Sequence, residues 1–275
     1  NGPIARTTLS REVSTVEVAP VYHVMPDGEP PFPVVSSRQH LVRCWIASNS
    51  LYLTEATGMQ WSTLVGGCRF LGAAVEGQLL PLPYASRQIE FLGDSITQGL
   101  RLLYTGTDAD TDLQIPYANW PQYVADLLNM KPVVTGFGGQ GLSSAGTCGA
   151  PPAIEAFPYV YHGVKYLPRV EPETVVIYHG TNDAVSAEDF QARYTAYLQL
   201  VRSTDPSARI FAICPHNITH YAVAIANAVS AMNNKGIVFL DYSTGVISPE
   251  DTCDGCHLNP GGAVVLATRM AFDIG

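Results

Sequence analysis

The feature that most constrains the fold is an alternation of apolar runs and amphipathic segments from Ile89 to the end of the chain. The apolar runs have the length and composition of buried strands and lie at residues 89–93, 132–136, 173–180, 208–215 and 236–241. Helical spacing marks segments between and after them, at residues 120–129, 186–203, 221–234 and 259–273. This alternation predicts an α/β fold, in which a parallel sheet is covered by helices on both faces.

The N-terminal part has a different texture. Between Ser14 and Tyr84, short β-type runs such as "LVRCWIAS" and "RFLGAAVEG" are separated by turn signals, and residues 25–33 form a loop rich in proline. No helical period is present. We therefore predict a small antiparallel β-sandwich module at residues 1–85, joined by the segment "LPLPYASRQ" to an α/β domain at residues 86–275.

Charge and composition narrow the classes of partner. The net charge of -9 and the lack of a Lys/Arg cluster argue against nucleic-acid binding. No apolar run approaches the roughly 18 residues of a membrane span. Charged residues make up only 14% of the chain, against about 25% in typical domains. Together with the sequon at Asn217 and a start at Asn1 without Met, this predicts a secreted protein, although such a start also fits a cloning boundary.

Polar motifs follow the predicted strands, at the edge where parallel sheets carry their functional residues. Ser95 comes directly after the first strand and leads into a helix, where a hydroxyl can act as a nucleophile or simply as an N-cap. The glycine-dense loop at residues 136–141 can present backbone N–H groups to a ligand, and it can also be a plain turn. Its glycines match G-x-G-x-x-G, but it is not the first turn after a strand and lacks the acidic partner of a dinucleotide site.

Two further motifs end later strands. Asn182 could donate its side-chain amide to an oxyanion, or it could open an Asx turn. Asp254 lies three residues before His257, so its carboxylate can hold one ring nitrogen while the other faces a nucleophile. A single histidine is more often structural, so each motif is ambiguous by itself.

In chain order, "GDSIT", "GFGGQG", "GTND" and "DGCHLNPGG" resemble the four blocks of the SGNH (GDSL-type) hydrolase family, over roughly residues 89–275. The resemblance implies a three-layer α/β fold and a serine esterase that needs no metal or cofactor. It implies Ser95 as nucleophile, His257 as general base and Asp254 as the residue that orients it. The oxyanion hole would comprise the backbone N–H groups of Ser95 and Gly138 and the side chain of Asn182. Asp94 and Asp183 would brace these loops.

A β-rich module in front of an SGNH domain is similar to the layout of carbohydrate esterase family two, whose members remove acetyl groups from plant polysaccharides. This likeness implies an acylated carbohydrate as substrate, on which Trp120, Tyr159 or Tyr161 could stack, unless these rings only pack in the core. Two alternatives stay open. One is a short-chain carboxylester hydrolase or lipase-like enzyme with an unrelated substrate, and the other is a non-catalytic carbohydrate-binding protein on the same scaffold. Oligomeric state and the acceptor of the acyl group are not predicted.

The cysteines allow competing interpretations. Cys253, Cys256 and His257 spell C-x-x-C-H, the attachment pattern of a c-type haem, or could bind zinc if Cys148 supplied a fourth ligand. In a secreted protein, Cys253 could instead form a disulfide with Cys256, or either could pair elsewhere, for example with Cys148. Cys44 and Cys68 could bridge within the β module. Cys214 lies inside a predicted strand and is expected to be a buried thiol.

Overall fold

The computed structural model describes residue 61 and residues 87–103, 118–146, 149–165 and 171–275. Within these residues, a five-stranded sheet has the order β2-β1-β5-β6-β7, and all its strands are parallel. The strands are β1 (Gln88–Gly93), β2 (Lys131–Gly136), β5 (Thr174–Tyr178), β6 (Arg209–Cys214) and β7 (Ile237–Asp241). The predicted α/β fold is confirmed. The predicted sandwich and the boundary at residue 85 lie outside the described residues and stay predictions.

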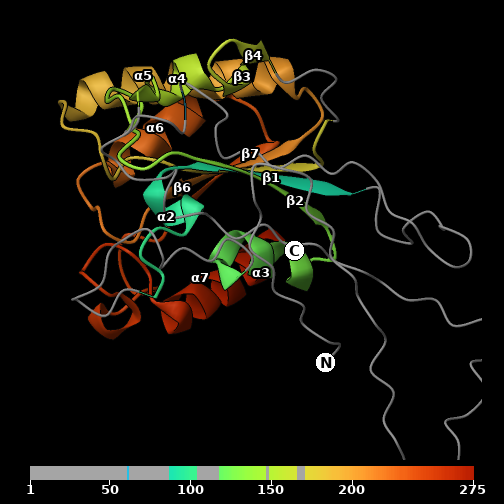
Figure 1. The fold of residues 1–275 in the computed structure, drawn as a ribbon. Helices are drawn as coiled ribbons and strands as arrows, with labels where there is room; N and C mark the ends of the chain where they lie inside the picture. The colour runs from blue at the N-terminus through green and yellow to red at the C-terminus, as the bar shows by residue number, and fades with distance from the viewer. Residues whose placement is uncertain (1–60, 62–86, 104–117, 147–148, 166–170) are drawn as a thin grey trace, which may run out of the picture. The chain divides into compact units, whose positions relative to one another are not determined.

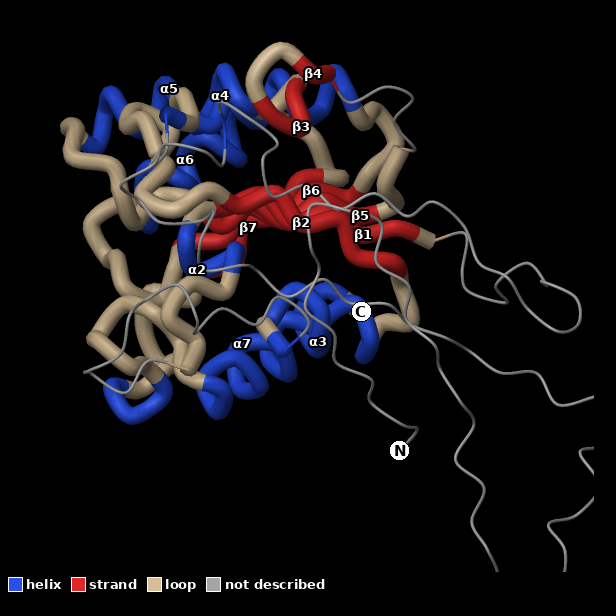
Figure 2. Tube along the Cα trace, in the orientation of Figure 1, coloured by secondary structure: helices blue, strands red, loops and turns tan. Residues whose placement is uncertain are grey.

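Helices cover both faces of this sheet (Figures 1 and 2). One face carries α5 (Ala187–Thr204), α6 (Ala222–Met232) and the single turn α4 (Ala153–Ala156). The other face carries α3 (Trp120–Leu127) and α7 (Pro260–Ile274). The chain therefore forms three layers, as the resemblance to SGNH hydrolases implied.

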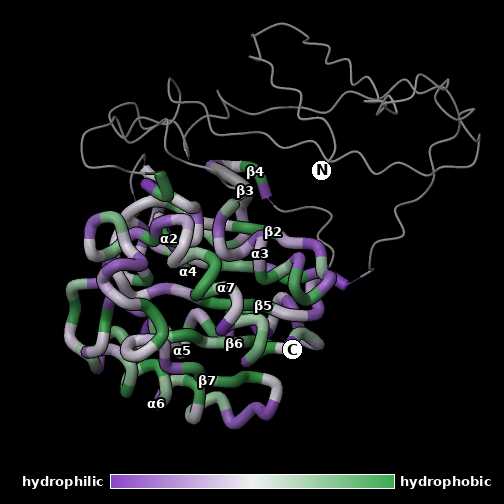
Figure 3. Tube along the Cα trace, turned by 90° about the horizontal axis from the view of Figure 1, so that it is seen from below, coloured by the Kyte–Doolittle hydropathy of each residue, from purple (hydrophilic) through white to green (hydrophobic). Residues whose placement is uncertain are grey.

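Alternating side chains of the central strands fill two separate cores. In β5, Val175 and Ile177 point into the core beneath α5 and α6, while Val176 and Tyr178 point into the core beneath α3 and α7. All four are fully buried, and burial of each such side chain stabilises the fold by about 1.5–3 kcal/mol. Figure 3 shows strongly hydrophobic colouring along β6 and β7. Burial on both faces explains why β5 and β6 read as continuous apolar runs.

Polar caps fix where the long helices begin. Asn119 accepts a hydrogen bond from the Trp120 backbone N–H at 2.8 Å, Ser186 caps α5, and Asn259 accepts from the Gly262 backbone N–H at 2.9 Å. Such caps satisfy N–H groups that have no partner inside the helix. The predicted starts of these helices are confirmed to within a residue or two.

Several short elements were not predicted. They are the antiparallel pair β3 (Tyr159–Tyr161) and β4 (Val164–Lys165) and the 3-10 turn η5 (Pro249–Asp251). The helix expected to follow Ser95 is the single turn α2 (Ser95–Gln98). Elements of two to four residues are too short to show a period in the sequence. The turns α2 and η5 flank the loops that hold the candidate site.

Candidate active site

Ser95 lies just beyond the carboxyl end of β1, as the first residue of α2. Asp94 begins this turn by accepting the Ile96 backbone N–H on Oδ1 at 2.9 Å. Gly93 has no space for a side chain, because a Cβ there would lie 2.0 Å from Thr97 Oγ1. The local sequence therefore forces a tight strand-to-helix turn that fixes the position of the serine.

His257 connects Ser95 to Asp254. Its Nε2 lies 3.0 Å from Ser95 Oγ, and its Nδ1 lies 2.8 Å from Asp254 Oδ2. An ionised carboxylate can only accept hydrogen bonds, so Nδ1 carries the proton and Nε2 accepts from the serine hydroxyl. The ring is therefore in the tautomer that can remove a proton from Ser95.

The Asp254 carboxylate receives several donors. Its Oδ1 accepts the backbone N–H groups of Cys256 and His257 at 3.0 and 2.7 Å, and its Oδ2 also accepts from Arg101 Nη1 at 2.9 Å. Partial burial alone would raise the pKa of Asp254, but the hydrogen bonds from His257 and Arg101 hold it well below its ordinary value. Asp254 therefore stays ionised at neutral and mildly acidic pH.

Asn182 lies beside the serine turn, in the loop after β5. Its Nδ2 donates to Asp94 Oδ2 at 3.2 Å and to the Gln140 carbonyl at 3.1 Å, so it joins the loops that follow β1 and β2. Gly138 lies in the turn after β2, next to Gly139, which has a φ of 68°. The structure thus brings Ser95 and Asn182 to one edge of the sheet, with the loop that carries Gly138 next to them.

Asp183 braces the glycine-rich loop from beneath. Its carboxylate accepts the backbone N–H groups of Leu142 and Ser143 at 3.0 and 2.6 Å, and also the Ser143 hydroxyl. Gly141 permits this contact, because a Cβ there would lie 2.7 Å from Asp183 Oδ2. Burial raises the pKa of Asp94 to about 7, against hydrogen bonds from Ile96 and Thr181, and the nearby Asp183 charge adds to the rise. Both carboxyl groups hold loops, as expected.

A group of residues in the loop after β6 was missed by sequence reasoning. His216 Nε2 donates to the Cys256 carbonyl at 3.0 Å, and its Nδ1 accepts from the Tyr178 hydroxyl at 2.8 Å. Burial lowers the pKa of His216, against the hydrogen bond to Cys256, so the ring stays neutral. Asn217 Nδ2 also donates to Cys256 Sγ at 3.2 Å. His216 comes two residues after the end of β6, so its place at a strand end was the available signal.

The aromatic residues considered for sugar stacking lie in different environments. Trp120 is fully buried between Phe91 and Tyr178 and donates its ring N–H to the Ile96 carbonyl at 3.1 Å, so it belongs to the core. Tyr159 is partly buried against Trp61, with ring centroids 6.3 Å apart. The side chain of Tyr161 lies outside the described part of the structure. The Trp120 ring therefore cannot stack on a sugar.

The cysteine interpretations change as well. The structure holds no disulfide between Cys253 and Cys256, so the pairing considered between them is not formed. Cys214 is a buried thiol, as expected, whereas Cys44, Cys68 and Cys148 lie outside the described residues. Both ring nitrogens of His257 are engaged by Ser95 and Asp254, which leaves neither for a haem iron or a zinc ion. The two cysteines of the C-x-x-C-H match instead form hydrogen bonds that hold the loop of His257, with Cys253 Sγ donating to the Arg101 carbonyl and Cys256 Sγ accepting from Asn217.

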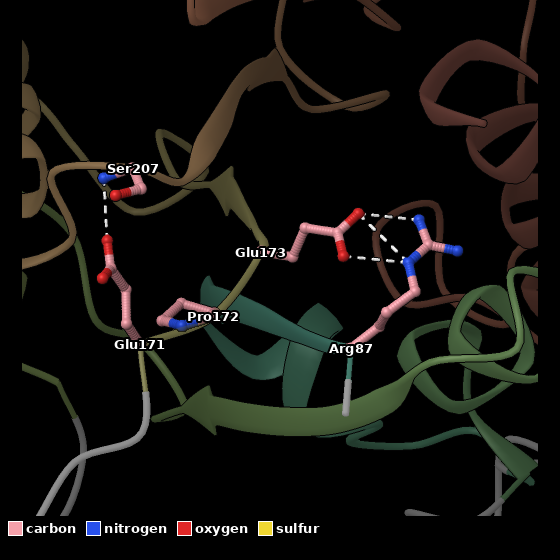
Figure 4. Close-up of a pocket in the computed structure, with 5 residues that line it drawn as sticks. All are labelled: Arg87, Glu171, Pro172, Glu173 and Ser207. Atoms are coloured by element: carbon pink, nitrogen blue, oxygen red, sulfur yellow. Dashed lines mark hydrogen bonds and ion pairs between the residues drawn. The ribbon is translucent and has the colours of Figure 1, made fainter. Parts of the chain in front are cut away.

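A shallow pocket at the other edge of the sheet has a different character (Figure 4). Arg87, Glu173 and Ser207 all precede the amino ends of strands. Arg87 forms an exposed ion pair with Glu173 at 2.7 Å, and Glu171 accepts the Ser207 backbone N–H at 2.7 Å. This pocket lies away from Ser95 and contains no nucleophile paired with a base.

The fold and the site define a three-layer α/β protein with a hydrogen-bonded serine, histidine and aspartate at one end of its parallel sheet. The sequence of residues 91–264 matches the model of the GDSL-like lipase/acylhydrolase family. The match extends over more than half of the chain, so the chain belongs to this family, which places it among the carboxylic ester hydrolases. No curated protein sequence matches the chain. None of the helices that the structure describes has the length and hydrophobicity needed to cross a membrane.

Solved structures with a similar fold include three carbohydrate esterases. A family 2 carbohydrate esterase with a carbohydrate-binding domain from Corynascus thermopiles (Myceliophthora fergusii) has a TM-score of 0.63 and 24% identity over 74% of this chain and 71% of its own. A family two esterase from Clostridium thermocellum, in complex with cellohexaose, has a TM-score of 0.63 and 23% identity over 71% and 66%. The acetyl xylan esterase Est2A from Butyrivibrio proteoclasticus has a TM-score of 0.63 and 16% identity over 72% and 66%. At these identities the likeness shows a shared fold.

Proposed function

We propose that the protein is a serine esterase that removes short acyl groups, most often acetyl, from carbohydrate esters. The observation that carries this proposal is the chain of hydrogen bonds from Ser95 through His257 to Asp254. A hydroxyl, an imidazole in the correct tautomer and an ionised carboxylate in this order are the groups that acyl transfer requires.

In the first half of the reaction, His257 Nε2 takes the proton of Ser95 as Oγ attacks the ester carbonyl carbon. The Asp254 carboxylate stabilises the imidazolium that forms. Collapse of the tetrahedral intermediate breaks the bond to the sugar oxygen, which leaves with the proton from His257. Water then attacks the acyl-serine by the same steps, and the acid is released.

The oxyanion of the tetrahedral intermediate would accept from the backbone N–H groups of Ser95 and Gly138 and from Asn182 Nδ2. In the resting site, both Nδ2 hydrogens of Asn182 are directed at Asp94 and Gln140, over distances of 3.2 and 3.1 Å. These are long bonds, so one of them can be exchanged for a developing negative charge at little cost. A stronger interaction in the transition state than in the ground state is what raises the rate.

The carbohydrate part of the proposal is supported by the neighbours with the same fold, one of which is an acetyl xylan esterase and another a complex with cellohexaose. The proposal also places the protein outside the cell. The competing candidates are a short-chain carboxylester hydrolase with an unrelated substrate and a carbohydrate-binding protein without turnover. The intact hydrogen-bonded chain at Ser95 favours turnover.

An activity panel tests the proposal. Acetylated xylan, acetylated mannan and p-nitrophenyl esters of graded acyl length would be offered to the wild type and to Ser95→Ala. We expect release of acetate from a polysaccharide, the highest rates with acetyl esters, and a loss of at least about 10³-fold in Ser95→Ala. Ser203→Ala is the matched control, because that hydroxyl lies on the exposed side of α5 and bonds only the Leu200 carbonyl.

Rates that rise with acyl length would contradict the acetyl preference. Sugar binding with no hydrolysis of any ester would favour the binding protein instead.

A further inference from the structure

Arg101 joins the segment after α2 to the loop that carries Asp254. Its Nη1 donates to Asp254 Oδ2 at 2.9 Å, and its backbone carbonyl accepts from Cys253 Sγ at 3.4 Å. The ion pair connects residues 153 positions apart in the chain. One residue therefore contacts the base-bearing loop through both its side chain and its main chain.

The guanidinium and the imidazole share one carboxylate oxygen. Oδ1 of Asp254 is occupied by two backbone N–H groups, so Oδ2 must serve both His257 Nδ1 and Arg101 Nη1. The pair is partly shielded from water, with side-chain exposures of 33% for Arg101 and 18% for Asp254. Charge-assisted hydrogen bonds of this kind fix the plane of a carboxylate.

The backbone of Arg101 is also unusual. Its φ is 59°, in the left-handed region that residues with a side chain seldom occupy. Such strain persists where the surroundings hold it, and it gathers at functional sites. Here the strained conformation belongs to the residue that contacts both Asp254 and Cys253.

We propose that Arg101 is a positioning residue of the esterase reaction, whose guanidinium fixes the Asp254 carboxylate that orients His257 and places a positive charge beside this pair. This inference rests on the proposed function, because it assigns Arg101 a task only if His257 acts as the base. The same hydrogen bonds keep the pKa of Asp254 well below its ordinary value. Arg101 contacts Asp254 through its side chain and Cys253 through its main chain, so its proposed action on the reaction runs through Asp254.

Among the described residues, other titratable groups face this part of the site, and each can contribute to the pH profile. They are Asp94 and Ser95 from the turn after β1, His216 from the loop after β6, and Asp254, Cys253 and Cys256 from the loop of His257 itself. Arg101 is the cation in this group that bonds Asp254 directly. Removing it changes the local charge by one unit while the other groups stay in place.

The test is the pH dependence of kcat/KM for p-nitrophenyl acetate. In Arg101→Gln the imidazolium forms more easily, so the acid limb of the profile should move to higher pH by about half to one unit. Arg101→Lys keeps the positive charge but loses the planar guanidinium. It should therefore return the acid limb to the wild-type pH while recovering only part of kcat. Arg87→Gln is the control, because it removes an arginine–carboxylate pair of 2.7 Å with Glu173, at the amino ends of the strands, and should leave the acid limb in place.

An acid limb unchanged in Arg101→Gln would overturn the inference, whatever happens to the absolute rate. A readout that needs no turnover covers variants with little activity. NMR titration of the His257 ring in a Ser95→Ala background should show protonation at higher pH when Arg101 is replaced. If the wild type hydrolyses no ester, the proposed function fails, and this titration still decides the charge effect. If Ser95→Ala abolishes hydrolysis while the titration is unaffected, only the role of Arg101 fails.

Discussion

At the scale of single residues, polar side chains of the site combine a role in the proposed chemistry with a role in holding the loops. Asn182 is the clearest case, because the amide proposed to meet an oxyanion also bonds Asp94 and the Gln140 carbonyl. His216 supports the main chain of Cys256, next to His257. A substitution at these positions therefore affects both the chemistry and the shape of the loops, and kcat must be separated from stability.

Asn182→Ala should lower kcat by about 10²- to 10³-fold with a much smaller change in KM, since one oxyanion donor is lost. Steady-state kinetics with p-nitrophenyl acetate measure this effect. Asn227→Ala removes an exposed amide that bonds Gln191 at 3.2 Å, and it should leave kcat unchanged. A normal kcat in Asn182→Ala would remove this residue from the oxyanion hole.

His179 should make stability depend on pH. The side chain is buried with no partner for Nδ1, and burial lowers its pKa from 6.5 to about 4, against the attraction of Asp183. The unfolded chain binds a proton below pH 6.5, whereas the folded protein does so only near pH 4. Stability is therefore lost as pH falls through this window, by up to about 3 kcal/mol.

Denaturant unfolding of the wild type and of His179→Gln at pH 7 and at pH 4.5 checks this prediction. The free energy of unfolding should differ less between the two pH values in His179→Gln than in the wild type. His220→Gln, at an exposed position, is the matched control and should keep the wild-type difference. An undiminished difference in His179→Gln would assign the pH dependence to other groups.

At the scale of elements, the sequence predicted the long units and missed the short ones. Strands such as β5 are buried on both faces, and helices such as α5 carry a cap and a regular apolar stripe, so each leaves a local signature. The positions of Ser95, Asn182 and His257 followed from strand ends. His216 also follows a strand end, but its role depends on a contact 40 residues away, and the role of Arg101 depends on a contact 153 residues away.

Two adjacent glycines at the start of α7 should respond differently to alanine. A Cβ on Gly262 would lie 2.0 Å from the Asp251 carbonyl oxygen, so Gly262→Ala must displace the turn η5 and should cost several kcal/mol. On Gly261 the nearest atom is Asn259 Oδ1 at 3.2 Å, and the gain in helix propensity of up to about 1 kcal/mol offsets that contact. Thermal unfolding should therefore separate the two variants clearly, and equal melting temperatures would contradict the close approach.

At the scale of the whole molecule, the strands lie in the sheet in the order β2-β1-β5-β6-β7. The loops after β1 and β5 therefore lie side by side where the connections diverge to opposite faces of the sheet. Ligands of open parallel sheets bind at this point, and Ser95 and Asn182 lie there. The opposite edge carries the Arg87–Glu173 pair, whose exposure implies a small contribution to stability. The three-layer arrangement separates the stabilising cores from the loops that carry the chemistry.

The sequon at Asn217 raises the question of whether the secreted protein would carry a glycan at this position. Its Nδ2 is the atom a glycan would modify, and it donates to Cys256 Sγ at 3.2 Å, beside His257. We expect Asn217 to stay unmodified in active protein from a glycosylating host, because a glycan would separate the two loops. Intact mass spectrometry measures this directly, and full occupancy with normal activity would contradict the packing.

Ser95 and His257 are separated by 162 positions, and α7 begins at Pro260, directly after the loop of the base. During synthesis the nucleophile therefore leaves the ribosome long before its partner. The base loop is seated by Gly262 against Asp251 and by α7 packing beneath the sheet, so it cannot take its place while that helix is still inside the exit tunnel. We therefore expect a nascent chain to be inert toward esters until α7 has left the ribosome and docked against the sheet.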